Sequence, residues 1–222
     1  MWDIKGVIFD LDGTLIDTEA LCNQSGVETG KALGLDLDLA FWETLAGIDD
    51  VNRLARINET CGTSIDQQTF YDTWDHFSAK ALERGVPYKP GVPDILDHFH
   101  ARNLPIALCT SSRRNMADVK IEVAGFTPYF AATVAFEDVQ HAKPAPDPYI
   151  LAAQMIGLAP NQCIAFEDSN AGAHSARAAG CLTIQVPDLQ EPDGVSAHVV
   201  GKSLFEGLEA AESLVNWATP AR

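Results

Sequence analysis

Residues 4–14 read IKGVIFDLDGT, a short apolar stretch that runs directly into two aspartates, a glycine and a threonine. The part from Ile4 to Phe9 is rich in β-branched residues and predicts a buried strand, and the polar residues after it predict a tight turn. Similar apolar runs follow later in the chain, at 106–109, 131–135, 163–166 and 182–186.

Helical patterns separate these runs, and several of them stop at a glycine. They cover about 93–99, 114–124, 147–157 and 171–179, with a closing helix at 203–215. Strands that alternate with helices predict a parallel sheet with helices on both faces. The sequence therefore predicts an α/β fold with a Rossmann-like, doubly wound parallel sheet, whose site lies at the carboxyl ends of the strands.

Residues 18–86 interrupt this alternation, because they contain no convincing strand pattern. An aromatic stripe with helical spacing lies there between a predicted N-cap at Asp66 and a stop at Gly85. We therefore expect a helical bundle inserted after the first strand. The expected domains are an α/β core of residues 1–17 and 87–222 and a helical domain of residues 18–86.

The chain is strongly acidic, with 31 acidic and 15 basic residues and a formal net charge of −16. Such a surface repels nucleic acid and anionic membranes, so neither is expected as a partner. The five cysteines form no Cys-x-x-Cys pair, which favours reduced thiols in a cytoplasmic protein. No signal peptide or membrane-spanning stretch is predicted, and a monomer is the expected state.

The turn after the first strand carries Asp10 and Asp12. Two carboxylates this close repel each other unless a cation neutralises them, and Mg²⁺ prefers such oxygen ligands. A carboxylate can also attack phosphorus to form an aspartyl-phosphate, and a second one can protonate the leaving oxygen and later activate water. The motif predicts a phosphoryl-transfer site.

Three later loops carry matching chemistry. Thr110 and Ser111 open a hydroxyl-rich turn whose backbone N–H groups can cradle a phosphate. Lys143 precedes two prolines, and a rigid turn would hold its ammonium where it neutralises both phosphate and nucleophile. Glu167 and Asp168 follow a buried strand and supply further oxygen ligands for a metal.

These four motifs, in this order, resemble the haloacid dehalogenase superfamily, and within it the β-phosphoglucomutase and sugar-phosphatase-like branch (subfamily IA). The resemblance covers the chain from Ile4 to about Val186. It implies that Asp10 is the nucleophile and Asp12 the general acid and base. The residues that it assigns to the transferring phosphoryl group are Thr110 and Lys143, with Ser111 as a further substrate-binding candidate.

The resemblance also implies a magnesium cofactor. The ion would be held by the Asp10 carboxylate, the backbone carbonyl of Asp12 and Asp168, with Glu167 binding it directly or through water. The expected activity is hydrolysis of a small phosphorylated metabolite, such as a sugar phosphate, by a phosphatase.

The family further implies that the helical domain is a mobile cap over the substrate. The segment 45–49, which contains Gly47, resembles the substrate-facing loop of such caps. A β-phosphoglucomutase is the alternative enzyme, but those enzymes usually carry a basic residue where Asp49 stands and a histidine where Cys22 stands. Both departures favour hydrolysis. The basic residues that could still hold substrate phosphate are Arg53, Arg113 and Arg114, of which Arg113 is the substrate-binding candidate.

Two other functions fit less well. The family's dehalogenases lack the second aspartate and the metal, whereas Asp12 is present here. A non-enzymatic phospho-receiver module also uses a magnesium-bound aspartate and a lysine on a parallel sheet. In such a module, however, neither Asp12 nor the long helical insertion serves an evident purpose.

Overall fold

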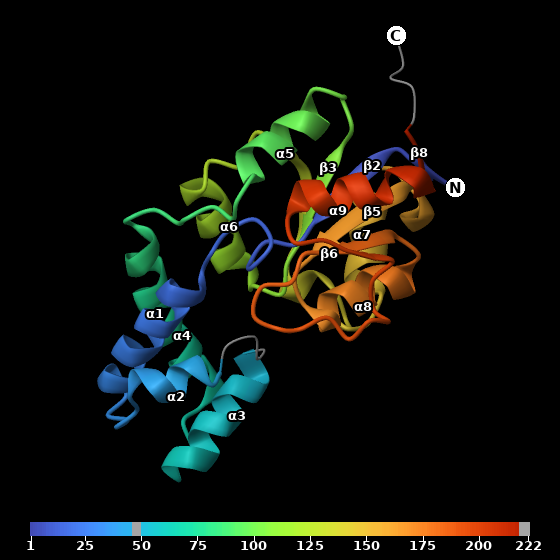
Figure 1. Ribbon diagram of the computed structural model, residues 1–222. Coiled ribbons are helices and arrows are strands. Elements are labelled where there is room, and N and C mark those ends of the chain that lie inside the picture. The colour runs from blue at the N-terminus through green and yellow to red at the C-terminus, as the bar shows by residue number, and fades with distance from the viewer. Residues whose placement is uncertain (46–49, 218–222) are drawn as a thin grey trace. The chain divides into compact units, whose positions relative to one another are not determined.

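The computed structural model describes residues 1–45 and 50–217. The chain divides into two compact units, one of residues 1–17 and 87–222 and the other of residues 18–86 (Figure 1). Among the described residues, no helix is both long and apolar enough to cross a membrane.

The first unit is built on a parallel sheet in the strand order β4-β3-β2-β5-β6-β7. Its strands are β2 (Gly6–Phe9), β3 (Ile106–Cys109), β4 (Phe130–Val134), β5 (Cys163–Glu167), β6 (Leu182–Gln185) and β7 (Val199–Val200). From β2 the chain adds β3 and β4 on one side of the sheet. It then crosses back and adds β5, β6 and β7 on the other side of β2. The carboxyl ends of β2 and β5 therefore flank the point where the strand order reverses, which is where sites form in open α/β sheets.

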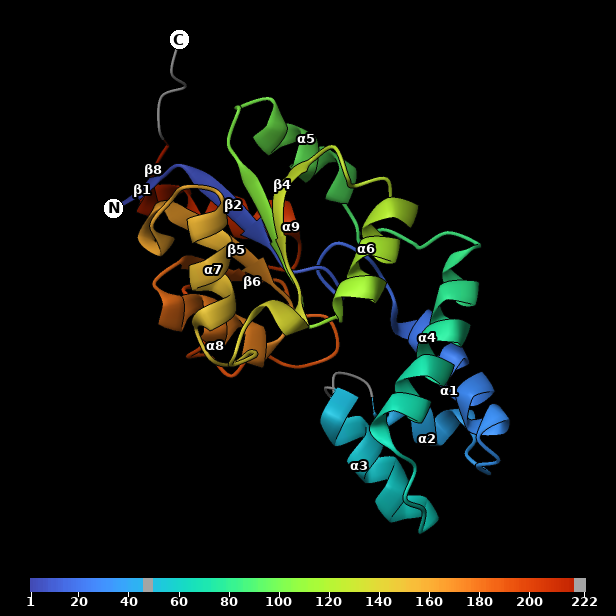
Figure 2. The ribbon, with the colours of Figure 1, turned by 180° about the vertical axis from the view of Figure 1, so that it is seen from behind.

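Helices cover both faces of this sheet, which confirms the predicted α/β class. They are α5 (Val92–His100), α6 (Arg114–Val123), α7 (Asp147–Met155), α8 (Asn170–Ala179) and α9 (Leu204–Ala211), with short 3₁₀ turns η1 (Phe136–Asp138), η2 (Pro160–Gln162) and η3 (Glu212–Leu214). Helices α7 and α8 pack together on one face, and α5 and α9 pack together on the other (Figures 1 and 2).

The two central strands are held together by aromatic side chains on one face of the sheet. Phe9 and Phe166 stand opposite each other in register, and their rings stack with centroids 4.8 Å apart. Phe99 of α5 closes this aromatic cluster, with ring centroids 6.0 Å from each of them. Aromatic pairs of this kind stabilise a fold by more than the free energy gained from burying their surface area. The residues that follow Phe9 and Phe166 thus start from a rigid base.

The two ends of the first unit differ from the prediction. The run from Ile4 to Phe9 is split at Lys5, so that β1 (Trp2–Ile4) leaves the main sheet and pairs in parallel with β8 (Val215–Trp217). The closing helix ends at Ala211 instead of continuing to residue 215. Val215 is buried and Trp217 packs 6.0 Å from Phe99, an alternation that suits a strand better than a helix.

The second unit contains helices joined by loops and no strand in its described residues, as the sequence predicts. Its helices are α1 (Glu19–Ala32), α2 (Leu39–Glu43), α3 (Asp50–Cys61) and α4 (Gln67–Leu82). The Asp66 side chain caps α4 by accepting hydrogen bonds from the backbone N–H groups of Gln68 and Thr69. Trp42 fills the centre and lies against Gly26 of α1, where an added Cβ would sit 2.4 Å from the indole ring. The glycine is what lets α1 approach this tryptophan so closely.

Candidate active site

Asp10 lies at the carboxyl end of β2, buried and fixed by its backbone. Its N–H donates to the Phe166 carbonyl at 3.0 Å, which ties it to β5. Its carboxylate Oδ1 accepts a hydrogen bond from Lys143 at 2.8 Å. Among the residues that the structure describes, Oδ2 is buried and has no hydrogen-bond partner. A buried carboxylate oxygen without a partner is costly, so it marks a place for a ligand.

Lys143 forms the centre of the site. Its ammonium donates to Asp10 Oδ1 at 2.8 Å, to the Cys109 carbonyl at 2.9 Å and to Glu167 Oε1 at 2.5 Å. Only 6% of its side chain is exposed. Burial alone would lower the pKa of Lys143, but the attraction of Asp10 and Glu167 outweighs it and raises the pKa well above its ordinary value. The ammonium is therefore a fixed, permanently charged group beside the nucleophile candidate.

Three carboxylates converge beside this lysine. Asp10, Glu167 and Asp168 each offer an oxygen within 4.8 Å of the others. Burial raises the pKa of Asp10 to about 7, against the attraction of Lys143. Burial and the repulsion of Asp10 and Glu167 raise the pKa of Asp168 to about 9. One lysine does not balance three carboxylates, and a hard divalent cation with oxygen ligands fits the remaining charge.

Two glycines make room for this cluster. Gly13 has a positive φ of 85°, and a Cβ there would lie 2.4 Å from Asp168 Oδ2. A Cβ on Gly172, at the start of α8, would lie 2.0 Å from the Glu167 carboxylate. Real Cβ atoms do not approach other atoms this closely, so a larger residue at either position would displace a carboxylate of this cluster.

Glu167 is held by more partners than the sequence suggested. Its Oε1 accepts a second hydrogen bond from the Tyr149 hydroxyl at 2.7 Å, and its Oε2 accepts one from Ser169 at 3.3 Å. The Tyr149 ring also lies 5.2 Å from the Lys143 ammonium. Sequence reasoning missed Tyr149, because it stands in an apolar helical run with no polar pattern around it. Glu167 and Tyr149 together orient Lys143.

Replacing Tyr149 by phenylalanine keeps the ring and removes the hydroxyl that Glu167 accepts from. Because the acceptor is a buried carboxylate, we expect a loss of about 1.5–3 kcal/mol in the free energy of unfolding, measured by denaturant titration. Tyr129→Phe is the matched control, since the Tyr129 hydroxyl donates to Asp97 at the exposed surface with the same bond length of 2.7 Å. Equal, small losses in both variants would show that the Tyr149 hydrogen bond does not support the site.

Thr110 and its neighbours form the turn after β3. Thr110 is buried, and its hydroxyl accepts a hydrogen bond from the Ser112 N–H at 3.0 Å. Ser111 is exposed, and Arg113 is the N-cap residue of α6. The Asp12 carboxylate is held at this turn: Oδ2 accepts from the Ser112 hydroxyl at 2.8 Å and Oδ1 from Lys120 at 2.7 Å.

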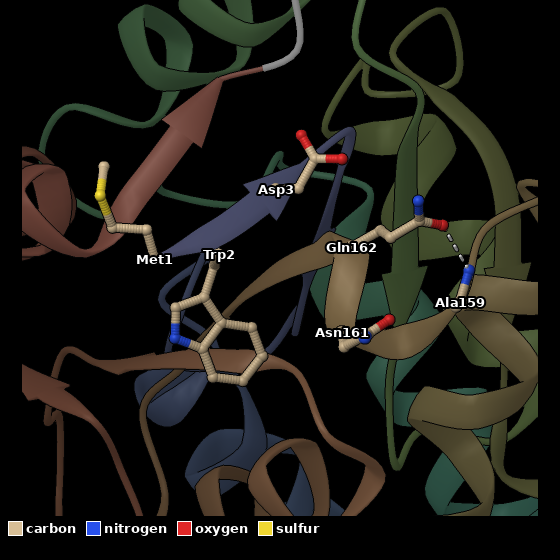
Figure 3. Close-up of a pocket in the computed structure, with 6 residues that line it drawn as sticks. All are labelled: Met1, Trp2, Asp3, Ala159, Asn161 and Gln162. Carbon is tan, nitrogen blue, oxygen red and sulfur yellow. Dashed lines mark hydrogen bonds between the residues drawn. The ribbon is translucent and has the colours of Figure 1, made fainter.

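Four further residues that the sequence singled out are Gly47, Asp49, Arg53 and Arg114. Gly47 and Asp49 lie outside the described residues. Arg53 lies over the Trp74 ring, 4.8 Å from its centroid, within the helical unit. Arg114 forms ion pairs with Asp138 and Asp118 and donates to the Thr133 carbonyl, so these contacts hold α6 to the end of β4. A pocket is formed where β1 meets η2, and Figure 3 shows the residues that line it: Met1, Trp2, Asp3, Ala159, Asn161 and Gln162. These residues come directly before β2 and β5 in the chain, so the pocket lies at the amino-terminal ends of these strands, whereas the three carboxylates lie at their carboxyl ends.

Comparison with known proteins identifies the family. Residues 4–180 match the model of the haloacid dehalogenase-like hydrolases. The chain belongs to this family. That assignment confirms the resemblance inferred from the motifs, and with it the predictions of a hydrolase and of its fold.

Named relatives match over most of their length. Protein CbbY of Rhodobacter capsulatus is 34% identical over 83% of this chain and 86% of its own. The fructose-1-phosphate phosphatase YqaB of Escherichia coli is 34% identical over 82% of this chain and 95% of its own. The crystal structure of CbbY from Rhodobacter sphaeroides in complex with phosphate superposes with a TM-score of 0.82 at 25% identity, covering 93% of this chain and 99% of that one. These findings agree with an enzyme that acts on phosphoric monoesters.

Proposed function

We propose that this protein is a magnesium-dependent phosphatase that hydrolyses a small sugar phosphate through an aspartyl-phosphate on Asp10. The observation that carries the proposal is the Asp10 carboxylate itself. One of its oxygens is held by the buried Lys143, while the other is buried without a partner among the described residues. The position and charge of this oxygen suit attack on a phosphoryl group.

The proposed reaction consists of two displacements at phosphorus, and each side chain has its own role in them. Asp10 attacks, and the bond from phosphorus to the leaving oxygen breaks while Asp12 donates a proton to that oxygen. Water, deprotonated by Asp12, then attacks the aspartyl-phosphate and releases phosphate and Asp10. Lys143 stays charged throughout, while it and the Thr110 turn offset the negative charge of the phosphoryl oxygens.

The residues that would hold Mg²⁺ are Asp10, Asp168 and the backbone carbonyl of Asp12. When bound, the ion neutralises the phosphoryl and carboxylate oxygens. Lys143 and Tyr149 already occupy Glu167 Oε1, so it is Oε2, which accepts a hydrogen bond from Ser169, that would reach the metal directly or through water.

The proposal includes the helical unit 18–86 as a cap with Gly47 in its substrate-facing loop, and a monomeric, cytoplasmic enzyme. All five cysteines lie in the described part of the chain and stand outside any disulfide, which supports a reducing location. The relatives named as sugar phosphatases support a sugar phosphate as the substrate class.

Phosphate release from a panel of phosphorylated sugars and sugar acids, with Mg²⁺ and with chelator, tests this function. Magnesium-dependent release from one compound class is the expected result. The panel includes β-glucose 1-phosphate with and without its bisphosphate. Its conversion to glucose 6-phosphate with little free phosphate would replace the proposal with a mutase.

Metal binding should also appear as a pH-dependent gain in stability. The pKa values of Asp10 and Asp168, about 7 and about 9, lie above the ordinary 3.8. A carboxyl group whose pKa is raised by folding stabilises the protein fully below its unfolded pKa, and this contribution is lost as pH rises through the folded value. The metal-free protein should therefore lose stability between about pH 4 and about pH 9.

Because ligands bind Mg²⁺ in their deprotonated form, the rise in Tm on adding Mg²⁺ should be larger at about pH 8 than at about pH 5. Thermal unfolding with Mg²⁺ and with chelator at both values measures this difference. An equal rise at both values would argue against the acidic cluster as the binding site.

A further inference from the structure

Lys120 is a nearly buried lysine on the inner face of α6. It is 8% exposed, and its buried neighbours on the same helix are Met116, Ala117 and Ile121. Helical spacing would place an apolar residue at this position. Lysine is rarely buried unless it is paired, and replacing a buried pair by apolar residues is often neutral or stabilising. Packing of α6 alone therefore does not explain the lysine.

The partners of Lys120 point to the catalytic motif. Its ammonium lies 2.7 Å from Asp12 Oδ1 and donates to the Ser112 hydroxyl at 2.8 Å. The Ser112 hydroxyl in turn donates to Asp12 Oδ2 at 2.8 Å. Lys120 and Ser112 thus hold one carboxylate oxygen each and also contact each other. This closed triangle fixes the carboxylate in one orientation.

That orientation separates Asp12 from the other acids. The carboxylates that converge are Asp10, Glu167 and Asp168, and the Asp12 side chain is not one of that group. The Asp12 side chain keeps 29% of its surface exposed, so it stays accessible from solvent while Lys120 holds it. An acid that must meet a leaving oxygen needs both a fixed place and an open face.

We propose that Lys120 is a positioning residue for Asp12, which holds this carboxylate at the Ser112 turn, ready to meet the leaving oxygen of the substrate. This inference rests on the proposed phosphatase function and adds to it a residue outside the four motifs. Lys120 does not touch the phosphoryl group in this role, since it acts only through Asp12.

The leaving group offers a readout that separates positioning from folding. An aryl phosphate such as p-nitrophenyl phosphate releases a stable phenolate and needs little proton donation. An alkyl phosphate such as fructose 1-phosphate releases a poor leaving group and depends on the acid. A loss confined to proton donation therefore lowers kcat/KM for the alkyl ester more than for the aryl ester. General destabilisation would lower both alike.

Lys120→Met is expected to lower kcat/KM about 30-fold for fructose 1-phosphate and about 3-fold or less for p-nitrophenyl phosphate. The larger loss is part of the rate enhancement of about 10²–10⁴-fold that general acid catalysis supplies. Lys120→Arg should restore part of the loss, because a guanidinium can donate to the same carboxylate. Ser112→Ala, which removes the other anchor, should shift the ratio of the two values in the same direction. In an Asp12→Asn background, Lys120→Met should have no further effect on the ratio.

Lys89→Met is the matched control. Lys89 is another partly buried lysine, paired with Asp188 at 2.6 Å, and its loss should lower Tm without changing the alkyl-to-aryl ratio. If Lys120→Met fails to fold, Lys120→Arg and Ser112→Ala still carry the comparison. Equal losses for both esters, or an additive loss in the Asp12→Asn background, would overturn the positioning role. If the wild-type protein releases phosphate from neither ester in the presence of Mg²⁺, that would instead overturn the phosphatase proposal on which this inference rests.

Discussion

Asp10→Asn abolishes turnover while the fold persists: this is the expected result for the variant with the largest effect. Asparagine has the same shape, and its amide oxygen can still accept the hydrogen bond from Lys143 that Asp10 Oδ1 accepts. It cannot form the aspartyl-phosphate, so phosphate release should fall by about 10⁴-fold or more. Phosphate release under saturating Mg²⁺ measures the loss.

The stability of this variant is a second expected result. The Asp10→Asn substitution removes one of three converging acids, so the metal-free variant should unfold at an equal or higher Tm than the wild type near neutral pH. Trapping of a phosphorylated wild-type protein, absent in the variant, locates the intermediate. Release above about 1% of wild type, with the asparagine intact by mass spectrometry, would exclude Asp10 as the nucleophile.

Lys143→Met should damage both the fold and the chemistry. The ammonium binds three acceptors, and without it Asp10 and Glu167 lose their shared cation. Breaking a buried ion pair by removing one partner costs about 3–5 kcal/mol. The negative oxygens of the phosphoryl group would also lose the fixed ammonium that offsets their charge, so kcat/KM should fall by about 10²–10³-fold.

The pH dependence distinguishes this loss from a simple packing defect. Lys143 holds down the pKa of Asp10, which burial otherwise raises, so that pKa should rise further in Lys143→Met. The metal-free variant should then lose stability more steeply than wild type as pH rises, and Mg²⁺ should recover part of the loss. Denaturant titrations at about pH 5.5 and about pH 8 measure this, and a deficit independent of pH would contradict it.

The sequence pattern alone predicts the sheet and much of the surroundings of Asp10, the proposed nucleophile. The apolar run before Asp10 and the one before Glu167 both predict buried strands, and parallel strands bring their carboxyl ends to one edge. The structure places Asp10, Lys143, Glu167 and Asp168 together, as that reasoning expects. Their roles in catalysis remain predictions.

The residues that pattern could not predict share one physical property. Lys120 and Tyr149 lie inside helices, and their partners Asp12 and Glu167 stand 108 and 18 residues away. Helical periodicity identifies the buried face of each helix but not which buried polar atom it will meet. The strand β8 was missed for a similar reason, because its partner β1 lies at the other end of the chain.

The central position of β2 has a consequence for how the molecule is made. Within the main sheet, β2 precedes all other strands in the chain, yet its hydrogen-bond partners are β3 and β5, which begin at Ile106 and Cys163. Pairings between such distant segments form slowly, because the entropy of closing a long loop is lost before any stabilising contact has formed. A nascent chain that has emerged only as far as the helical unit therefore holds an apolar strand without neighbours and an Asp10 without its lysine. The proposed site is complete only once β5 docks, and until then β2 exposes an apolar strand of the kind that chaperones bind or that aggregates.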